Sequence, residues 1–377
     1  MPEPTKSIEK KSFSFPYKVR VEPRLDEITW WQSLSITIFA LVLALLIGAL
    51  ILAVVGGDPW KAYAHIAKAS FGDIGVFSDT MVKAIPLILV GLASTVAFRM
   101  KLWNIGAEGQ FFLGAFGASM VVLLPVLPAD SPQWLFILVM MLFGITFGAL
   151  WGFIPGYLKV KFNVNEVISS LMMNYIAFKW NDFFIYAVWS EGGFQMSKMF
   201  PKNAWLPRLS DYGKIIPELR GLTTHFGLIF ALIAVVIIWF ILYRSKWGYE
   251  IRLIGDNPKA ANYAGIKLGR NTILVMMLSG GLAGLAGMSE ISGVVHRLQG
   301  AISPGYGFTG IIVAWLAKLN PFLVIVVSIL FGALILAGRE IQPSGIPKLI
   351  QGIILVCLIA SDFLVRNRIR VFRKVQD

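Results

Sequence analysis

The sequence contains few of the residues on which soluble enzymes and disulfide-rich proteins depend. It has one cysteine and three histidines, and 15% of its residues are charged, against about 25% in an average soluble domain. Because Cys357 stands alone and His65, His225 and His296 are dispersed, there is no disulfide framework and no recognisable metal-ligand spacing. The sequence also lacks a GxxxxGKS or GxxxxGKT phosphate-binding loop. We therefore predict no catalytic residue, no metal site and no cofactor bound by this chain.

Apolar residues, by contrast, make up 56% of the 377 positions, and they occur in runs. Most runs are roughly 18–25 residues long, which is the length a helix needs to cross a bilayer. The clear runs are Ser33–Val55, Asp79–Phe98, Asn104–Leu127, Trp134–Leu158, Val164–Val188, His225–Tyr243, Thr272–Ser292 and Ile346–Leu364. We therefore predict an all-α polytopic membrane protein whose transmembrane domain covers residues 33–364.

Basic residues predict how the spans are oriented, because Lys and Arg gather in cytoplasmic loops. The loop 244–271 carries six of them and the C-terminal tail, residues 365–377, carries five. We place both in the cytoplasm together with the N-terminal tail, residues 1–32, and we place the loop 189–224 outside. That outer loop also holds five Lys or Arg, but the rule is weak for long loops. The net charge of +13 thus indicates orientation in a membrane and not a nucleic-acid partner.

One further apolar block, Phe308–Gly338, is 31 residues long and is interrupted at Lys318–Pro321. Two cytoplasmic tails require an even number of spans, so this block must enter and return, which gives about ten transmembrane helices. Because 31 residues are few for two full spans, we expect one limb to be a short or re-entrant half-helix. Non-helical backbone at that depth is tolerated only against protein or a water-filled cavity. The block is therefore a candidate lining for a pathway.

Small residues recur in two of the predicted spans and indicate close helix packing in the membrane. The first set is Gly144, Gly148, Gly152 and Gly156, and the second is Ser279, Gly280, Gly281, Ala283, Gly284 and Gly287. We predict that these helices pack against protein in a compact bundle.

The run that begins WNIGAEGQFF carries a carboxylate, Glu108, inside an apolar segment. As a helix starting at Asn104, it would place Asn104, Glu108 and Phe111 on one face, opposite its glycines. A charge in the bilayer centre costs about 2.5–3.5 kcal/mol on insertion scales, so exposure to lipid is disfavoured. Two interpretations stay open: a structural carboxylate near a helix N-terminus, or one that lines a cytoplasmic vestibule. Glu166, at the start of the fifth span, raises the same alternatives.

Other polar residues lie in or near the predicted spans, and they form no chain of carboxylates for a proton relay. They include Lys83, Asn174, Lys179, Asp182 and Glu290. Lys179 and Asp182 are three residues apart, which allows them to pair on a helix.

The cytoplasmic loop contains DNPKAANYAG, which has the features of a short helix. Asp256 or Asn257 can cap it, Pro258 suits its first turn and Gly265 can end it. Two turns of helix are marginal in water. We therefore expect this segment to dock, either on its own protein or on a partner.

Five motifs in order along the chain resemble the permeases of bacterial ABC importers, the family that serves ribose, other simple sugars, nucleosides and branched-chain amino acids. The similarity is greatest to the longer permease of purine-nucleoside importers, and it covers about Leu87 to Leu364. The motifs are WNIGAEGQFFLGA, NEVISSLMMNYIA, GDNPKAANYAGI, SGGLAGLAG and GYGFTGIIVAWLAKLNP.

The resemblance implies a type II-like permease of ten helices in the bacterial cytoplasmic membrane. Its implied partners are a second, homologous permease, a cytoplasmic ABC ATPase that binds ATP and Mg²⁺, an extracytoplasmic substrate-binding lipoprotein and membrane lipid. The segment from Asp256 to Gly265 would be the coupling helix that sits in a groove of the ATPase. The implied ATPase-coupling residues are Asp256, Asn257, Pro258, Ala260, Ala261, Tyr263 and Gly265.

The resemblance makes nucleosides, and purine nucleosides first, the expected substrate, with simple sugars such as ribose as the alternative. Transport would proceed by alternating access. An uncharged polar substrate also fits a pathway without a concentrated charge cluster. The predicted pathway residues are Asn104, Glu108, Phe111, Phe112, Asn174, Phe308 and Thr309. A different class, an ion-coupled secondary transporter, would need Glu108 or Glu166 as its coupling site.

Overall fold

The computed structural model describes residues 17–23, 30–338 and 346–373. Parts of the predicted tails, residues 1–16, 24–29 and 374–377, lie outside this description, as do residues 339–345. The chain divides into two compact units, residues 1–47 with 352–377 and residues 48–351, and each is described by itself.

The smaller unit pairs the two ends of the chain. Strand β1 (Tyr17–Pro23) runs antiparallel to β2 (Asn367–Arg373), with Tyr17 opposite Arg373 and Pro23 opposite Asn367. The unit also contains most of helices α1 (Trp30–Val54) and α13 (Ile346–Arg366). The sequence analysis treated the two tails as separate segments, because strand pairing between residues about 350 positions apart leaves no local signal.

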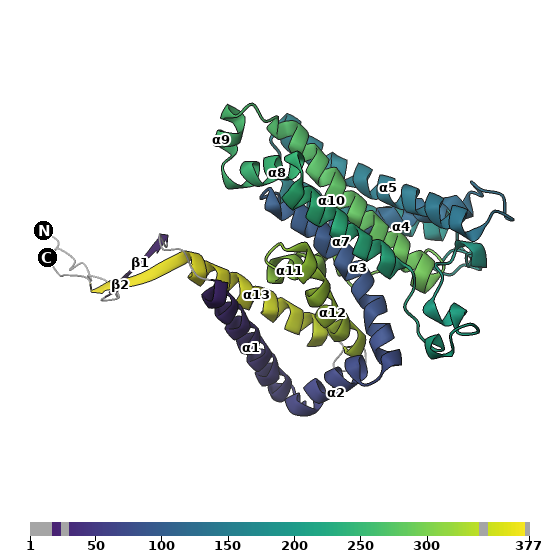
Figure 1. Ribbon diagram of the computed structural model, residues 1–377, viewed down its shortest axis with the longest axis horizontal. Coiled ribbons are helices and arrows are strands. Elements are labelled where there is room, and N and C mark those ends of the chain that lie inside the picture. The colour runs from purple at the N-terminus through teal and green to yellow at the C-terminus, as the bar shows by residue number, and fades with distance from the viewer. Residues whose placement is uncertain (1–16, 24–29, 339–345, 374–377) are drawn as a thin grey trace, which may run out of the picture. The chain divides into compact units, whose positions relative to one another are not determined.

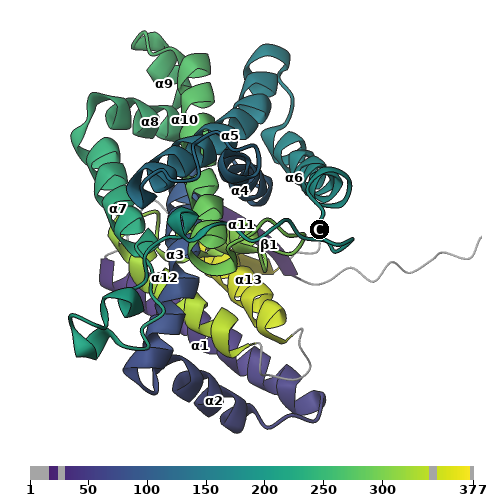
Figure 2. The same cartoon turned by 90° about the vertical axis from the view of Figure 1, so that its right-hand side faces the viewer.

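The larger unit is a helical bundle (Figures 1 and 2). Its helices are α2 (Pro59–Phe71), α3 (Ile74–Arg99), α4 (Ala107–Leu123), α5 (Gln133–Phe162), α6 (Glu166–Phe183), α7 (Gly227–Arg244), α8 (Lys246–Asp256), α9 (Pro258–Tyr263), α10 (Leu268–Glu290), α11 (Tyr306–Leu316) and α12 (Pro321–Ala337). By length and composition, the described residues include four helices able to cross a membrane, or five if a bent pair counts as one span, and further shorter apolar helices. These helices confirm the predicted all-α polytopic fold class.

The predicted small-residue contacts occur between α5 and α10. A methyl group on Gly148 would overlap the carbonyl oxygen of Gly280, and one on Gly280 would overlap the carbonyl oxygen of Gly148. Gly284 meets the carbonyl oxygen of Gly144 in the same way, and Gly114 of α4 abuts the backbone of Gly284. Because no side chain separates these backbones, α4, α5 and α10 form the closely packed centre of the unit.

The block Phe308–Gly338 is broken as predicted. Helix α11 has 11 residues, about 16 Å at 1.5 Å per residue, which is too short to cross a hydrocarbon core of about 30 Å. The chain turns at Lys318 and Leu319, both at positive φ, and Asn320 caps α12 by accepting from the backbone N–H of Phe322 at 3.0 Å. The expectation of one short limb is therefore confirmed.

Two details differ from the predicted spans. Helix α4 begins at Ala107 and not at Asn104, because the Asn104 side chain accepts from the backbone N–H of Gly106 at 3.1 Å and closes a turn in place of a helical residue. Asn104 therefore does not share a helix face with Glu108. The analysis also missed α2 and α8, which are too short and too polar to read as spans.

Candidate functional site

The short helix predicted in the loop 244–271 is present as α9. The Asn257 side chain accepts from the backbone N–H of Ala260 at 3.1 Å, and Pro258 is the first helical residue. After the helix, Gly265 adopts φ +76°, a conformation that favours glycine. The capping and ending residues inferred from the sequence are therefore confirmed, with Asn257 rather than Asp256 as the cap.

Helix α9 presents one surface outward and buries another. Ala261 is fully buried, whereas Tyr263 is 92% exposed. Asp256, Asn257, Pro258 and Gly265 are also exposed, and Ala260 is half-buried. Aromatic side chains are enriched in protein–protein interfaces, so the exposed Tyr263 is a candidate contact for a partner.

Helix α8 holds α9 firmly against the bundle. A methyl group on Gly255 would overlap the carbonyl oxygen of Arg99 at the end of α3, and one on Gly248 would overlap the carbonyl oxygen of Ile241 in α7. A side-chain network adds α10, since the indole of Trp247 donates to Oδ1 of Asn271 at 2.7 Å. Helix α8, which leads directly into α9, is therefore in close contact with α3, α7 and α10. Figure 1 shows α8 and α9 beside the start of α10, at what we call the α9 end.

The turn before α4 is buried within the bundle, and polar side chains provide its hydrogen-bond partners. Asn104 donates through Nδ2 to Oε1 of Gln110 and to Oγ of Ser279, each at 2.9 Å. Ser279 in turn donates to the carbonyl oxygen of Ala93 at 2.8 Å. Buried polar groups at this depth must find protein partners. Asn104 thus joins the start of α4 to α10 and α3.

Asn174 of α6 hydrogen-bonds to the backbone of the same turn and of the first residues of α4. Its Oδ1 accepts from the backbone N–H of Gly109 at 2.7 Å, and its Nδ2 donates to the carbonyl oxygen of Ile105 at 2.9 Å. Ser170 accepts from the backbone N–H of Ile105 at 3.2 Å. Unpaired backbone groups at a helix start require such partners, and here α6 supplies them.

Glu108 connects two helix N-termini that are about 200 residues apart. It stands in the first turn of α4 and accepts the backbone N–H of Gly307 in the first turn of α11. The Ser303 side chain also hydrogen-bonds to it. A helix N-terminus favours negative charge, and two of them meet at this carboxylate. Glu166 is also buried, but it differs in pairing at 2.6 Å with Lys159, whose side chain is one-third exposed.

The predicted pathway residues separate into two groups. In the isolated chain Phe308 is 42% exposed, and the other six are buried. The buried residues are Asn104, Glu108, Phe111, Phe112, Asn174 and Thr309. The structure thus gathers Asn104, Glu108 and Asn174 at the start of α4, and it leaves one of the seven open to a partner or a pathway.

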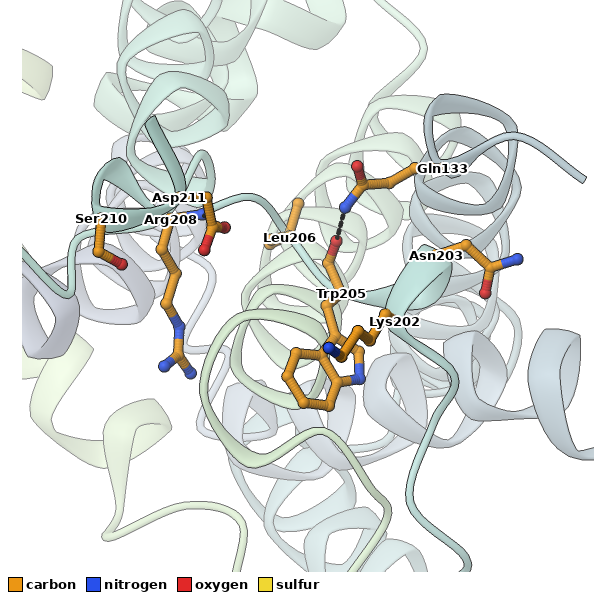
Figure 3. Close-up of a pocket in the computed structure, with 8 residues that line it drawn as sticks. All are labelled: Gln133, Lys202, Asn203, Trp205, Leu206, Arg208, Ser210 and Asp211. Carbon is orange, nitrogen blue, oxygen red and sulfur yellow. Dashed lines mark hydrogen bonds between the residues drawn. The ribbon is translucent and has the colours of Figure 1, made fainter. Parts of the chain in front are cut away.

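At the opposite end of the larger unit, which we call the loop end, the segment 189–226 is fastened to α5 and α10. Gln133 donates to the carbonyl oxygen of Trp205 at 2.8 Å, beside a cleft of about 530 Å³ (Figure 3). The Trp205 ring stacks on His296 with centroids 3.8 Å apart. The Arg208 guanidinium donates to the carbonyl oxygen of Gly293 at 3.0 Å and lies 2.7 Å from Nε2 of His296.

Two histidines at the loop end are held in their neutral form. Burial together with the Arg208 cation lowers the pKa of His296 to about 4. His225 accepts the backbone N–H of Gly227 through Nδ1 at 3.1 Å, which requires an unprotonated nitrogen at that position. The sequence analysis found no role for either residue, since their partners lie far along the chain.

The loop end also contains a buried ion pair that sequence reasoning missed. Lys83 Nζ of α3 lies 3.5 Å from Glu290 Oε1 of α10, and both side chains are less than one-tenth exposed. Both residues were noted as intramembrane polar groups, but 207 positions separate them. Spacing also predicts the pair Lys179 and Asp182, three residues apart, and it is confirmed at 3.2 Å.

Comparison with known proteins places the chain among transport proteins. Residues 76–359 match the family described as branched-chain amino acid transport system / permease component. The chain is 34% identical to the guanosine ABC transporter permease protein NupP of Bacillus subtilis, over 88% of this chain and 94% of that protein. It is 30% identical to the glucose ABC transporter permease protein TsgB13 of Haloferax volcanii, over 94% of each.

A second permease of Bacillus subtilis, the guanosine ABC transporter permease protein NupQ, is also similar. It is 27% identical over 67% of this chain and 78% of that protein. The matched family model spans most of the sequence, and the matched relatives are covered almost end to end. The chain therefore belongs to the branched-chain amino acid transport system permease family: it is the multi-pass membrane permease subunit of an ABC importer, and not a catalytic subunit.

Proposed function

We propose that this chain forms one half of the translocation pathway of an ATP-driven nucleoside importer, and that α9 is its coupling helix. The observation that carries the proposal is the construction of the α9 end. Helix α9 exposes Tyr263 almost completely, yet it is tied through Gly255, Gly248 and the Trp247–Asn271 bond to three helices of the bundle. A helix that is open to a partner and rigidly joined to the core can transmit motion.

The proposal fixes the orientation and the partners. The α9 end and both chain termini face the cytoplasm, where α9 sits in a groove of an ABC ATPase that supplies ATP and Mg²⁺. The loop end faces outward and receives an extracytoplasmic binding lipoprotein. A second, homologous permease completes the pathway, in keeping with the two guanosine permeases of Bacillus subtilis that resemble this chain. The assembly lies in the cytoplasmic membrane of a bacterium.

The proposed pathway runs along the start of α4 and along α11. Discontinuous helices whose N-termini meet near the middle of a membrane are the usual setting of transporter binding sites. Here α4 and α11 both begin inside the bundle and meet at Glu108. We assign Asn104, Glu108, Asn174 and Thr309 to the frame of the pathway wall, with Phe111 and Phe112 packed behind it. Phe308, exposed on α11, would contact the substrate.

A purine nucleoside is the first choice of substrate, and a simple sugar is the second. The guanosine permease NupP is 34% identical to this chain and the glucose permease TsgB13 is 30% identical, each over most of its length. Direct binding of guanosine, adenosine, glucose and ribose by the cognate lipoprotein distinguishes the two. Tight binding of a sugar, with none of either nucleoside, would overturn the first choice.

The coupling assignment is tested by replacing residues 257–261 with a flexible Gly/Ser segment. Without the Asn257 cap and Pro258, α9 should not form. We expect uptake by the reconstituted importer to be abolished and the ATPase to co-purify poorly. The chain should still insert in the membrane, because no predicted span is altered.

A matched control is the same Gly/Ser replacement at residues 214–218, a surface segment of equal length at the loop end. It should leave ATPase association unchanged. Wild-type uptake by the α9 variant would disprove the coupling role. Concentration of solute on an ion gradient by the chain alone, without the ATPase, would instead show a secondary transporter.

A further inference from the structure

A second cleft, of about 320 Å³, opens at the loop end of the larger unit between α3, α12 and the segments 208–223 and 293–294. Its polar lining consists of Asp79, Lys83, Arg208 and Thr223. Lys83 of this lining pairs with Glu290, which does not line the cleft itself, and both side chains are buried. Ionisable groups buried in a membrane domain are expensive and usually serve a function.

The charges around this cleft balance. Glu290 offsets the charge of Lys83 from outside the lining, which leaves the Asp79 carboxylate and the Arg208 guanidinium as opposite charges in the cleft. A charged ligand would therefore bring in a charge that the lining does not compensate. A neutral ligand that both donates and accepts hydrogen bonds suits the polar lining better.

The polar side chains that line this cleft can form more hydrogen bonds than those within the chain. The ammonium group of Lys83 has three N–H donors, of which the contact with Glu290 uses one. Thr223 donates to Oδ1 of Asp79 at 2.6 Å, which engages one oxygen of that carboxylate. A vicinal diol is suited to this lining, because each hydroxyl can donate to a carboxylate while it accepts from an ammonium or guanidinium group.

We propose that this cleft is a binding site for the sugar hydroxyls of the transported solute, at the loop end of the pathway. The proposal rests on the proposed function and extends it by naming the chemistry at one site. Its volume lies near the lower end of the range for small-molecule pockets, about 300–1,000 Å³, and so suits a pentose or hexose better than a whole nucleoside. A site for hydroxyls would serve a nucleoside and a simple sugar alike, which are the two solutes named for the relatives.

The test measures binding of methyl β-D-ribofuranoside to the full-length chain in lipid nanodiscs, by saturation-transfer NMR. Wild-type protein should bind the riboside, and its 2,3-dideoxy analogue should give at least tenfold less signal transfer. Asp79→Asn and Thr223→Val should each weaken binding of the riboside about tenfold, since each removes a charge-assisted or aligning contact. Asp182→Asn is the matched control, because that carboxylate pairs with Lys179 on α6 and does not line the cleft.

Either of two results would overturn the assignment: no riboside binding by the wild type, or equal binding by the wild type and both cleft variants. Thermal unfolding of each variant shows whether a loss reflects misfolding, and Thr223→Val serves if Asp79→Asn does not fold. Uptake of guanosine and glucose by the complete importer separates the two proposals. Riboside binding without uptake of either solute would contradict the proposed function alone, and uptake without riboside binding would contradict the cleft alone.

Discussion

The two ends of the larger unit are held by ion pairs of opposite character. At the α9 end, Lys159 and Glu166 lie 2.6 Å apart, join neighbouring helices and remain partly open, with side chains 33% and 11% exposed. At the loop end, Lys83 and Glu290 lie 3.5 Å apart, join distant helices and are closed off, at 8% and 4%. Solvent can reach the Lys159 side chain of the first pair. The second pair is shielded from solvent, so it stays paired only while the surrounding elements cover it.

This contrast extends beyond the ion pairs. The α9 end offers an exposed tyrosine and a helix whose limits are set by its own residues, Asn257, Pro258 and Gly265. The loop end is instead assembled from long-range contacts, such as Trp205 on His296 and Arg208 on Gly293. One end thus exposes a short helix set by its own residues, as the proposed docking role requires, and the other holds a fixed arrangement of buried charge.

The largest effect on stability is expected at the loop end, for Glu290→Ala. Removing one member of a buried pair leaves an uncompensated charge and costs about 3–5 kcal/mol. The double variant Lys83→Met/Glu290→Leu should regain most of the lost stability, because well-packed apolar residues often replace a buried pair without loss. Thermal unfolding of the three proteins in nanodiscs measures the difference. Equal unfolding temperatures for wild type and Glu290→Ala would mean that the loop end is as open as the α9 end.

At the α9 end, the substitution Gly255→Val should lower transport activity rather than stability. It places a side chain against the carbonyl oxygen of Arg99 and forces α8 away from α3. We expect at least a tenfold fall in uptake with little change in membrane insertion, since the link between α9 and the bundle is lost. Gly352→Ala is the matched control, because a methyl group there meets nothing within 4 Å. Uptake that stayed normal in Gly255→Val would show that α8 does not carry the motion.

The same contrast explains how far sequence reasoning could reach. The apolar runs, the close packing of the glycine-rich helices against protein, the break at Lys318–Pro321 and the caps of α9 follow from local pattern, and all are present. That α5 and α10 pack against each other does not follow from it. The start of α4 was misplaced by three residues, because the Asn104 side chain accepts the backbone N–H of Gly106 and forms a turn before the helix. The roles assigned to the pathway and coupling residues stay predictions, since they depend on partner chains.

What local pattern could not supply is any contact between distant segments. Glu108 stood out as a carboxylate in an apolar run, but its partner Gly307 carries no signal beyond a glycine beside a helix start. Lys83 and Glu290 stood out for the same reason, and nothing in their spacing joins them. Pairing of this kind is decided by packing of the whole bundle.

Acid should weaken the loop end before the α9 end. His296 has a pKa of about 4 in the folded chain, against about 6.5 for an unperturbed histidine. The unfolded chain therefore takes up protons first, so this contribution to stability is complete above about pH 6.5 and is lost as the pH falls toward 4. Unfolding temperatures between pH 7.5 and 4 should decline less steeply for His296→Gln, which does not titrate. Identical pH profiles for wild type and variant would rule out this linkage.

The smallest effect is expected for Glu166→Gln at the α9 end. Glu166 is buried but its partner Lys159 is one-third exposed, so solvent screens the pair and we expect a contribution of about 1 kcal/mol. Glutamine can still accept a hydrogen bond from the ammonium group, so the unfolding temperature should change by no more than a few degrees and should become less sensitive to salt. Glu108→Gln should lower the unfolding temperature more than Glu166→Gln does, because the Glu108 carboxylate is buried and accepts the backbone N–H of Gly307. If Glu166→Gln destabilised the protein as much as Glu290→Ala, the α9 end would also be closed, and the division between a docking end and a fixed end would not hold.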